Sequence, residues 1–331
     1  MAMTSRERVL SALNLKKPDR VPWIESYIHD ELASALVGKT VKAPAGARIA
    51  AEVLEVLKID NITFNLKPPE FTEKTFSAGL DFVGDGLIKT WADLEKIKLP
   101  DPDDEKFYIP VKDYLRKNKK DRTAIANTRF GISNAYLSMG METFSYALYD
   151  DRKLVETILD LFVNWSVRLV KHFNELGFDV VLLGDDLAAK TGPIFSPQVV
   201  RELFLPRMRK VTEALKLPWI YHSDGNIMPI LDDLLTLGMN GIANLEPGPM
   251  DIVRVKRDYG HKVCLVGNID LHYTLTRGTP EETEREVRER IEQVGRNGGY
   301  IIASSNGLTN YCQPQNVLAM SRAVEKYGPY K

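Results

Sequence analysis

The amino-acid sequence predicts an α/β protein folded as a (β/α)₈ TIM barrel. Eight short apolar runs have the length and composition of buried strands, and each is followed by a stretch with helical spacing. Regular alternation of strand and helix favours a parallel sheet, and eight such units favour a closed barrel. An open, doubly wound sheet is the alternative, but no glycine-rich phosphate-binding fingerprint follows any of these runs.

The expected elements follow one another through the chain with few interruptions. Thr4 and Glu7 match a capping box that opens the first helix, and Ser196 followed by Pro197 matches the start of another. We expect strands at 21–26, 60–65, 122–128, 178–186, within 219–226, and at 241–247, 261–270 and 298–307. We expect the intervening helices at 29–58, 140–176, 196–215, 228–237, 250–259, 280–296 and 314–327.

One stretch, residues 66–118, breaks this alternation. It contains two short apolar runs around the sequence Gly84-Asp85-Gly86, which is typical of a hairpin turn. We therefore expect an excursion between strands 2 and 3 near the barrel mouth, with residues 1–331 forming one barrel domain.

Composition narrows the classes of partner. The chain has 331 residues, 44% of them hydrophobic, and a formal net charge of −1. The absence of a basic excess argues against nucleic acid as a partner, and no apolar run approaches the roughly 20 residues of a membrane span. Its two cysteines form no disulfide framework, and its charged start is unlike a signal peptide. A cytoplasmic protein with no membrane partner is the expectation.

Polar residues collect where the predicted strands end. In a (β/α)₈ barrel the C-terminal ends of all strands meet at one mouth, where active sites lie. Each of these residues has a structural alternative as a helix N-cap or a turn residue, but the set converges on one place. The candidate residues are Glu25, Asn65, Arg129, Asp185, Asp186, His222, Asp224, Glu246, Asn268 and Asn306.

Three of these residues form a potential metal or acid/base group. His222 and Asp224 are two positions apart, so an extended strand points them the same way. Glu246 follows the next apolar run and reaches the same end of the sheet. An imidazole with carboxylates suits zinc or another divalent ion, and without a metal His222 would still serve as a general acid or base.

Five segments of the sequence resemble the uroporphyrinogen decarboxylase superfamily, whose fold is a (β/α)₈ barrel. They are RERVLSALNLKKPDRVP, GDDLAAKTGPIFSP, WIYHSDGNI, LEPG and VGNID, in that order along nearly the whole chain. True decarboxylases of the family carry an arginine motif after the first strand and an aspartate at the end of the second. Here WIESYIHDE lacks the arginine and Asn65 stands at the aspartate position. The resemblance therefore implies a different substrate.

A second branch of the superfamily consists of methyltransferases that serve corrinoid proteins. Their zinc is held by a His-x-Cys pair, often a glutamate about two dozen residues later, and a cysteine near the last strand. His222 and Glu246 match the histidine and glutamate, whereas Asp224 and Asn306 occupy the cysteine positions. Cys312 lies six residues beyond the last of these positions. Without thiolates the chain is more similar to the aryl-ether O-demethylase members.

This resemblance implies a methyltransferase that moves a methyl group from a small-molecule O-methyl donor, such as an aryl methyl ether, to a corrinoid protein. Zinc is the implied metal, with His222, Asp224 and Glu246 as its ligands. His222, Asp224, Asp185 and Asp186 are the expected catalytic residues, and Glu25, Asn65, Arg129, Asn268 and Asn306 the expected substrate-binding residues. The alternative is a cofactor-free decarboxylase of a different carboxylic acid, with Arg129 holding a carboxylate.

Overall fold

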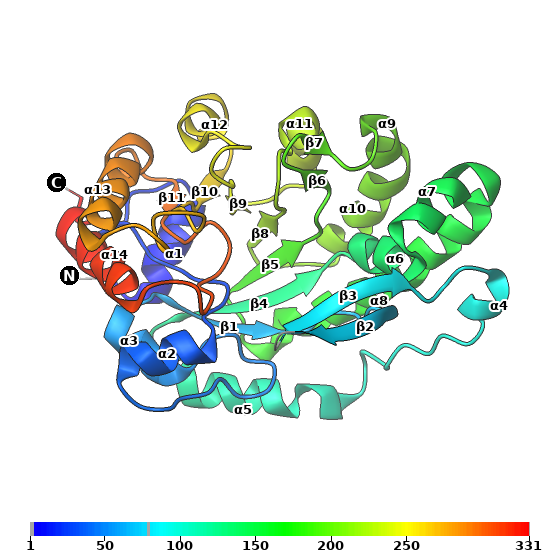
Figure 1. The fold of residues 1–331 in the computed structure, drawn as a ribbon, viewed down its shortest axis with the longest axis horizontal. Helices are drawn as coiled ribbons and strands as arrows, with labels where there is room; N and C mark the ends of the chain where they lie inside the picture. Colours follow the sequence, from blue (N-terminus) through cyan, green and yellow to red (C-terminus); the bar gives the residue numbers. More distant parts are fainter. Residues whose placement is uncertain (1–2, 78–79, 331) are drawn as a thin grey trace.

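A seven-stranded parallel sheet curls through the centre of the molecule (Figure 1). The structure is a computed structural model that describes residues 3–77 and 80–330. Every neighbouring pair in the sheet is parallel. In spatial order the strands are β1 (Asn61–Asn65), β4 (Thr123–Arg129), β5 (Val180–Gly184), β8 (Trp219–His222), β9 (Gly241–Ala243), β10 (Cys264–Val266) and β11 (Tyr300–Ile301).

The first predicted strand, 21–26, lies between the two edges of this sheet and closes it into a barrel. Trp23 forms a parallel bridge with Ile302 beside β11, and its carbonyl accepts a hydrogen bond from the Asp60 N–H at 2.8 Å, beside β1. The Asn61 side chain replaces further backbone pairing, because its amide accepts from the Glu25 N–H (3.0 Å) and donates to the Glu25 carbonyl (2.9 Å). The predicted (β/α)₈ barrel is confirmed, with its first strand reduced to this bridge.

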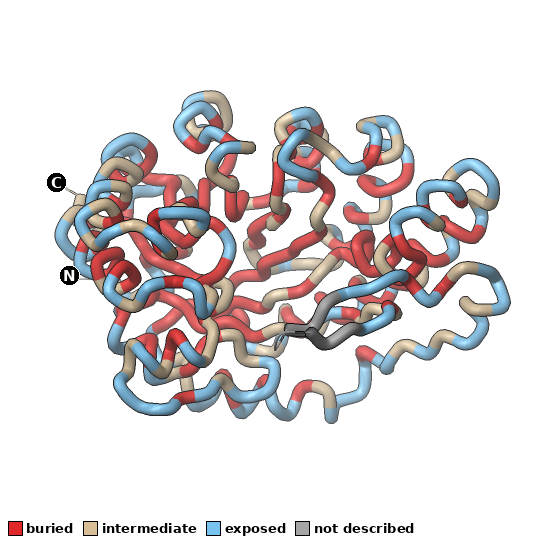
Figure 2. Tube along the Cα trace, in the orientation of Figure 1, coloured by how far each residue is buried: buried red, intermediate tan, exposed pale blue. Residues whose placement is uncertain are grey.

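Helices surround the sheet and leave the strands buried (Figure 2). The predicted capping box at Thr4 and Glu7 is confirmed, as is the N-cap at Ser196. The covering helices are α1 (Ser5–Leu13), α2 (Asp30–Val37), α3 (Ala51–Leu57), α6 (Ile132–Met139), α7 (Met141–Asp150), α8 (Arg152–Leu176), α9 (Pro197–Val199), α10 (Leu205–Glu213), α11 (Leu231–Leu235), α12 (Ile252–Tyr259), α13 (Pro280–Arg290) and α14 (Pro314–Tyr327).

Two predicted helical stretches are interrupted in the structure. The stretch 29–58 is divided into α2 and α3 by a loop that contains Pro44 and Gly46, residues that disfavour helix. The stretch 140–176 contains α7 and α8, and a further helix, α6, precedes it. Single turns of other helix types adjoin α9, α10, α11 and α13 at Val200–Phe204, Met228–Ile230 and Ile291–Gly295. A small hairpin, β6 (Ala188–Ala189) and β7 (Gly192–Pro193), follows β5.

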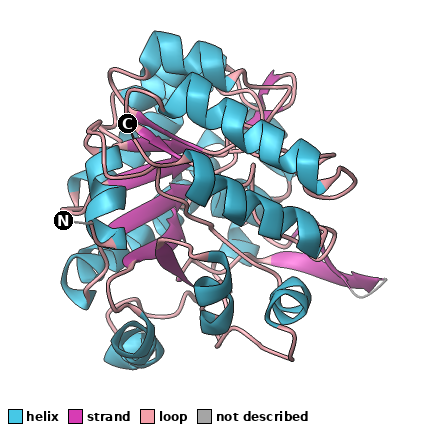
Figure 3. Cartoon of the chain, turned by 90° about the vertical axis from the view of Figure 1, so that its left-hand side faces the viewer, coloured by secondary structure: helices cyan, strands magenta, loops and turns pink. Residues whose placement is uncertain are grey.

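The excursion between β1 and β4 begins with an antiparallel hairpin of β2 (Thr72–Ser77) and β3 (Leu80–Gly86), which projects from the body in Figure 3. The predicted turn at Gly84-Asp85-Gly86 is wrong, because these residues lie in β3, and residues 78–79 between the strands lie outside the described residues. After α4 (Trp91–Leu94) and a turn at Glu105–Tyr108, helix α5 (Ile109–Asn118) returns to the barrel wall, where Tyr114 packs on Phe64 with ring centroids 5.5 Å apart.

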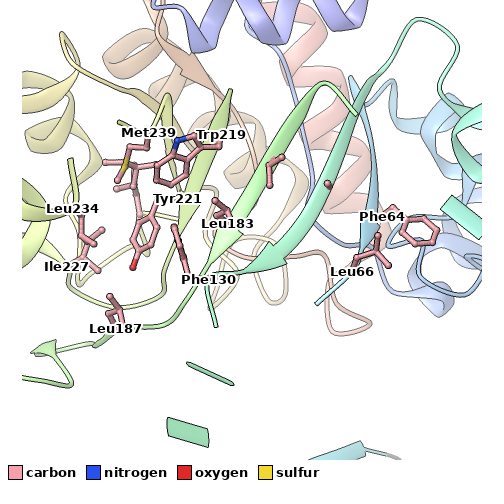
Figure 4. Close-up of a cluster of buried hydrophobic side chains, with 14 of the residues drawn as sticks. Phe64, Leu66, Phe130, Leu183, Leu187, Trp219, Tyr221, Ile227, Leu234 and Met239 are labelled. Atoms are coloured by element: carbon pink, nitrogen blue, oxygen red, sulfur yellow. The ribbon is translucent and has the colours of Figure 1, made fainter. Parts of the chain in front are cut away.

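Alternation of side chains along the strands divides the core in two. Outward residues such as Trp219 and Tyr221 pack under the helices, and Figure 4 shows them beside Phe130 and Leu183. Inward residues such as Ile220 fill the barrel interior, where α1 adds further apolar side chains at one end. Cys264 and Cys312 are both buried and free. None of the described helices is long and apolar enough to cross a membrane.

A buried carboxylate beside the closing strand generates a stability prediction. Asp60 accepts hydrogen bonds from Arg8 (2.7 Å), Arg20 (2.8 Å) and the Trp23 N–H (2.8 Å). Replacing Asp60 with alanine leaves the buried Arg8 guanidinium without this partner, so we expect Asp60→Ala to lower the free energy of unfolding by about 3–5 kcal/mol. Urea denaturation measures this loss. The exposed pair of Asp113 and Arg116 supplies the control, since Asp113→Ala should cost about 1 kcal/mol or less. Equal losses in the two variants would contradict this role of Asp60.

Candidate functional site

A polar cavity of about 250 Å³ opens where the strands of the barrel end. Asn65 and Lys67 come from the end of β1, Asn127 and Arg129 from β4, Asp185 and Asp186 from the residues after β5, and His222 and Asp224 from β8 and the residues after it. A smaller apolar recess of about 20 Å³ lies in the barrel interior, and His222 and Asn306 line both spaces. The cavity is therefore at the position where barrel proteins hold their active sites.

Strand alternation explains why His222 faces this cavity. Ile220 belongs to the interior core, and His222, two residues later, points the same way. Ligand atoms of His222, Asp224 and Asp186 lie within 4.8 Å of one another, and all three residues are half-buried. The Asp224 N–H also donates to Oδ1 of Asp186 (3.1 Å), which ties the two loops together. These three side chains form the group that we call the His222 group.

Two asparagine side chains orient Asp224 within the His222 group. Nδ2 of Asn244 lies 2.7 Å from Oδ1 of Asp224 and 3.3 Å from Nε2 of His222. Nδ2 of Asn306 lies 2.9 Å from Oδ2 of Asp224. The structure thus brings together His222, Asp224 and Asn306, three of the four positions that the resemblance matched to zinc ligands.

The donor set of the His222 group fits a divalent metal ion. Nδ1 of His222 is buried and has no hydrogen-bond partner among the described residues. Burial raises the pKa of Asp224, an effect that His222 opposes. One imidazole and two carboxylates would supply nitrogen and oxygen ligands, which zinc and harder divalent ions accept. The described cysteines, Cys264 and Cys312, are not part of this group.

Glu246, the third predicted ligand, lies beside the His222 group but outside it. Its Oε2 accepts a hydrogen bond from the Gly225 N–H (3.2 Å), and its Oε1 lies 3.3 Å from Nε2 of His272. In this arrangement Glu246 supports the loop that carries Asp224. Asp186, predicted as a catalytic residue, takes the third place in the group, and the role of Glu246 as a ligand stays a prediction.

Asp185 is buried, and its carboxylate caps the first turn of α6. It accepts hydrogen bonds from the backbone N–H groups of Ile132 (3.0 Å) and Ser133 (3.1 Å) and from the Ser133 hydroxyl. Burial raises the pKa of Asp185 to about 6, although Arg129 and these donors oppose the change. Because both oxygens are engaged in this way, the geometry favours a positioning role for Asp185 over direct contact with a reacting group.

Glu25 is another buried carboxyl group, on the floor of the recess rather than at the mouth. It accepts hydrogen bonds from the Trp23 indole (2.8 Å), the Ser304 N–H (2.9 Å) and the Ser304 hydroxyl (2.6 Å). Burial raises the pKa of Glu25 to about 7 despite these donors. Glu25 lines the small recess and not the polar cavity, and its role in substrate binding stays a prediction.

The remaining predicted substrate-binding residues differ in position. Asn65, Arg129 and Asn306 line the polar cavity. Asn268 is buried behind the wall, where it donates to the Leu245 carbonyl (2.6 Å) and accepts from Nε of Arg290 (3.1 Å). Contact between Asn268 and substrate stays a prediction, and the hydrogen bonds favour a structural role.

Sequence reasoning missed two cations and an amide of this site, Arg48, Lys67 and Asn244. Arg48 lies in the loop between α2 and α3, inside a stretch predicted to be helical. Lys67 lies two residues beyond the inward-facing strand position Asn65, whereas Asn244 directly follows the inward-facing Ala243 and has a positive φ of 75° that interrupts the alternation. Extending the strand alternation past each strand end is the signal that would have found Lys67.

The fold and this cavity define a barrel protein with a polar, metal-compatible site at the C-terminal mouth. The sequence matches the family described as Uroporphyrinogen decarboxylase (URO-D) over residues 82–327, and the chain belongs to that family. A solved "methyltransferase from Methanosarcina mazei" superposes with a TM-score of 0.79 at 22% identity, covering 98% of this chain and 99% of that one.

Individual relatives carry two different names. A Methylcobamide:CoM methyltransferase MtaA of Methanosarcina barkeri strain Fusaro is 24% identical over 98% of each chain. A second Methanosarcina barkeri protein of that name is 25% identical over 53% of this chain and 49% of its own length. A Uroporphyrinogen decarboxylase of Chlorobium phaeovibrioides is 25% identical over 72% of this chain and 70% of its own.

The raised pKa of Glu25 predicts a dependence of stability on pH. Between pH 4.5 and about 7 the folded state keeps a proton on Glu25 that the unfolded state has released, so stability rises as the pH falls through this window. Glu25→Gln mimics the protonated form at every pH. Relative to this variant, we expect the wild type to lose on the order of 3 kcal/mol of unfolding free energy from pH 4.5 to pH 8. Urea denaturation of both proteins measures these free energies. A difference in unfolding free energy that stays constant from pH 4.5 to pH 8 would contradict the raised pKa of Glu25.

Proposed function

We propose that this protein is a methyltransferase that moves a methyl group from a small O-methyl donor, such as an aryl methyl ether, to a corrinoid protein at the barrel mouth. The observation that carries the proposal is the convergence of His222, Asp224 and Asp186 at the cavity. The similarity to Methylcobamide:CoM methyltransferases along the whole chain supports the corrinoid branch. The absence of thiolate ligands in the group supports an oxygen-based donor over a thiol.

His222, Asp224 and Asp186 would hold a divalent ion, with zinc as our choice. When bound, such an ion supplies a Lewis acid that stabilises negative charge on a coordinated oxygen. The side-chain amides of Asn244 and Asn306 donate hydrogen bonds of 2.7 and 2.9 Å to the Asp224 carboxylate. The carboxylate would therefore already be oriented when the metal ion binds. Asp185 positions the wall of the cavity through its bonds to α6.

The proposed reaction breaks the bond between the methyl carbon and the ether oxygen. Oxygen keeps the electron pair of that bond and leaves as an alkoxide or phenolate, while Co(I) of the partner provides the pair for the new carbon–cobalt bond. The leaving oxygen needs stabilisation as its charge develops, and the His222 group lies where it can provide it. Its half-buried position limits water in the site, which strengthens that stabilisation.

A second function, cofactor-free decarboxylation of a small acid, is favoured by one observation. Arg48, Lys67 and Arg129 line the same cavity and would bind a carboxylate. In this case His222 or Asp224 would donate the proton that replaces carbon dioxide. A requirement for metal would separate the two functions, because only the proposed methyl transfer uses one.

We expect the purified protein, prepared without chelator, to bind about one zinc ion and to form methylcobalamin from cob(I)alamin and an O-methyl donor. Because His222 and Asp224 supply two of three ligand side chains, His222→Ala and Asp224→Asn should each weaken zinc binding at least tenfold and abolish transfer. Equilibrium dialysis measures the metal, and absorbance of methylcobalamin measures transfer.

His261→Ala is the matched control, because His261 is exposed and distant in sequence from the group. Glu246→Gln should retain zinc, since Glu246 bonds Gly225 and His272 instead of the group. If Glu246→Gln lost its zinc, Glu246 would be a metal ligand, as the sequence predicted. A wild-type protein that binds no stoichiometric zinc would defeat the metal assignment and favour the decarboxylase.

We also expect no conversion of uroporphyrinogen to coproporphyrinogen. Asn65 stands at the position of the family's aspartate, and a cavity of about 250 Å³ is small for a ring of four pyrroles. The measurement is product formation from uroporphyrinogen under reducing conditions. Turnover on the order of 1 s⁻¹ or faster would contradict this prediction.

A further inference from the structure

Three cationic side chains line one part of the polar cavity, on strands next to those that carry the His222 group. Lys67 follows β1, Arg129 ends β4, and Arg48 reaches the cavity from the loop between α2 and α3. That loop pairs with β1, since Ala47 bridges Phe64 and the Arg48 N–H donates to the Thr63 carbonyl (2.9 Å). The cations thus come from β1, β4 and the loop that pairs with β1, whereas the His222 group comes from the ends of the next two strands, β5 and β8. We call Arg48, Lys67 and Arg129 the cationic wall.

Arg48 is the member of the cationic wall whose charge is least compensated. Its guanidinium stacks on the Tyr27 ring, 4.4 Å from the ring centroid. Its Nε is buried and has no hydrogen-bond partner, and no ion pair involves Arg48 within the described part of the chain. Burial lowers the pKa of Arg48, with only a smaller opposing effect from Tyr27. Arg48 is half-buried, and a partly desolvated charge without an ion-pair partner is costly, so an anion bound at Arg48 would be stabilised.

Lys67 and Arg129 share a single carboxylate. Nζ of Lys67 lies 3.1 Å from Oε1 of Glu70, and Nε of Arg129 lies 3.8 Å from the same atom. Arg129 also donates from Nη1 to the Ser133 hydroxyl at 2.5 Å. Within the described residues, Glu70 is the carboxylate at ion-pair distance from these two cations, and the buried Asp185 also attracts Arg129 electrostatically. Lys67 and Arg129 are therefore largely compensated, and Arg48 provides the unpaired donors that would bind an anion.

We propose that Arg48, assisted by Lys67 and Arg129, binds an oxyanion of the substrate, and that the substrate is consequently a small O-methylated organic acid. The acid group would occupy the cationic wall while the methyl-bearing oxygen faces the His222 group. The O-methyl group of this substrate rests on the proposed methyl transfer. The oxyanion subsite does not depend on that function. A carboxylate and a sulfonate share the required chemistry, because a guanidinium forms paired hydrogen bonds with either.

Binding to the zinc-loaded wild-type protein tests the substrate class without any variant. Isothermal titration calorimetry would compare 3-methoxybenzoate, 3-methoxybenzenesulfonate and the neutral 3-methoxybenzamide. We expect at least one of the two acids to bind ten times or more tighter than the amide, and its affinity to fall as salt rises. The stronger acid identifies the source of the oxyanion. An amide that binds as tightly as both acids would overturn the proposal.

A charge-removing variant assigns the effect to Arg48. Arg48→Met keeps an unbranched apolar stem against Tyr27, so we expect a loss of at least tenfold in acid affinity, little change for the amide and unchanged zinc content. Arg168→Met is the control, because Arg168 is exposed and pairs with Asp101 and Asp103 away from the cavity. If Arg48→Met does not fold, Arg48→Gln takes its place. Unchanged acid affinity in a folded Arg48 variant would overturn the assignment.

The outcomes for the subsite and for the proposed function are distinguishable. Acid binding that requires Arg48, with no methylcobalamin formed from any O-methylated acid, would sustain the subsite and defeat the methyl transfer. Methyl transfer from neutral ethers that is insensitive to Arg48→Met would sustain the transfer and overturn the subsite.

Discussion

The closed barrel imposes one constraint on which the site depends, namely that each strand directs only every second side chain inward. On some strands an interior apolar residue is followed two positions later by a polar one that lines the cavity, as Ile220 is followed by His222 and Ile125 by Asn127. All strands of the sheet run parallel, so the polar residues at their C-terminal ends meet at one end of the barrel. Closure through Trp23, between β11 and β1, is what converts a curved sheet into an enclosed space.

This constraint explains how much of the structure could be predicted from the sequence. Strand order, the barrel and the faces of His222, Asp224 and Arg129 follow from periodicity, which is a local property of the chain. The choice between Asp186 and Glu246 as neighbour of His222 was not predictable, because it depends on how two loops pack after their strands end. Arg48 was missed for a similar reason, since its loop reaches the cavity through pairing with β1.

Membership of the uroporphyrinogen decarboxylase family fixes the scaffold but leaves the chemistry to the cavity. This chain lacks the arginine motif that the family's decarboxylases carry after the first strand. Its cavity still contains an arginine, Arg48, which comes from a later loop. Likewise, the cysteine positions of the methyltransferase branch hold Asp224 and Asn306, and these residues still lie together, joined at 2.9 Å. Under the proposed function, each location would be kept while the residue type changes, and the ligands would be harder than thiolates.

Helix α6 connects the cavity wall to the projecting hairpin. Asp185 holds its first turn, and at its other end Ser138 accepts hydrogen bonds from the Phe71 N–H (3.0 Å, to its hydroxyl) and the Ile88 N–H (2.8 Å, to its carbonyl), on either side of β2 and β3. The same eight-residue helix therefore holds both Asp185 and the two ends of the hairpin. The position of the hairpin is in this way fixed relative to the wall of the cavity.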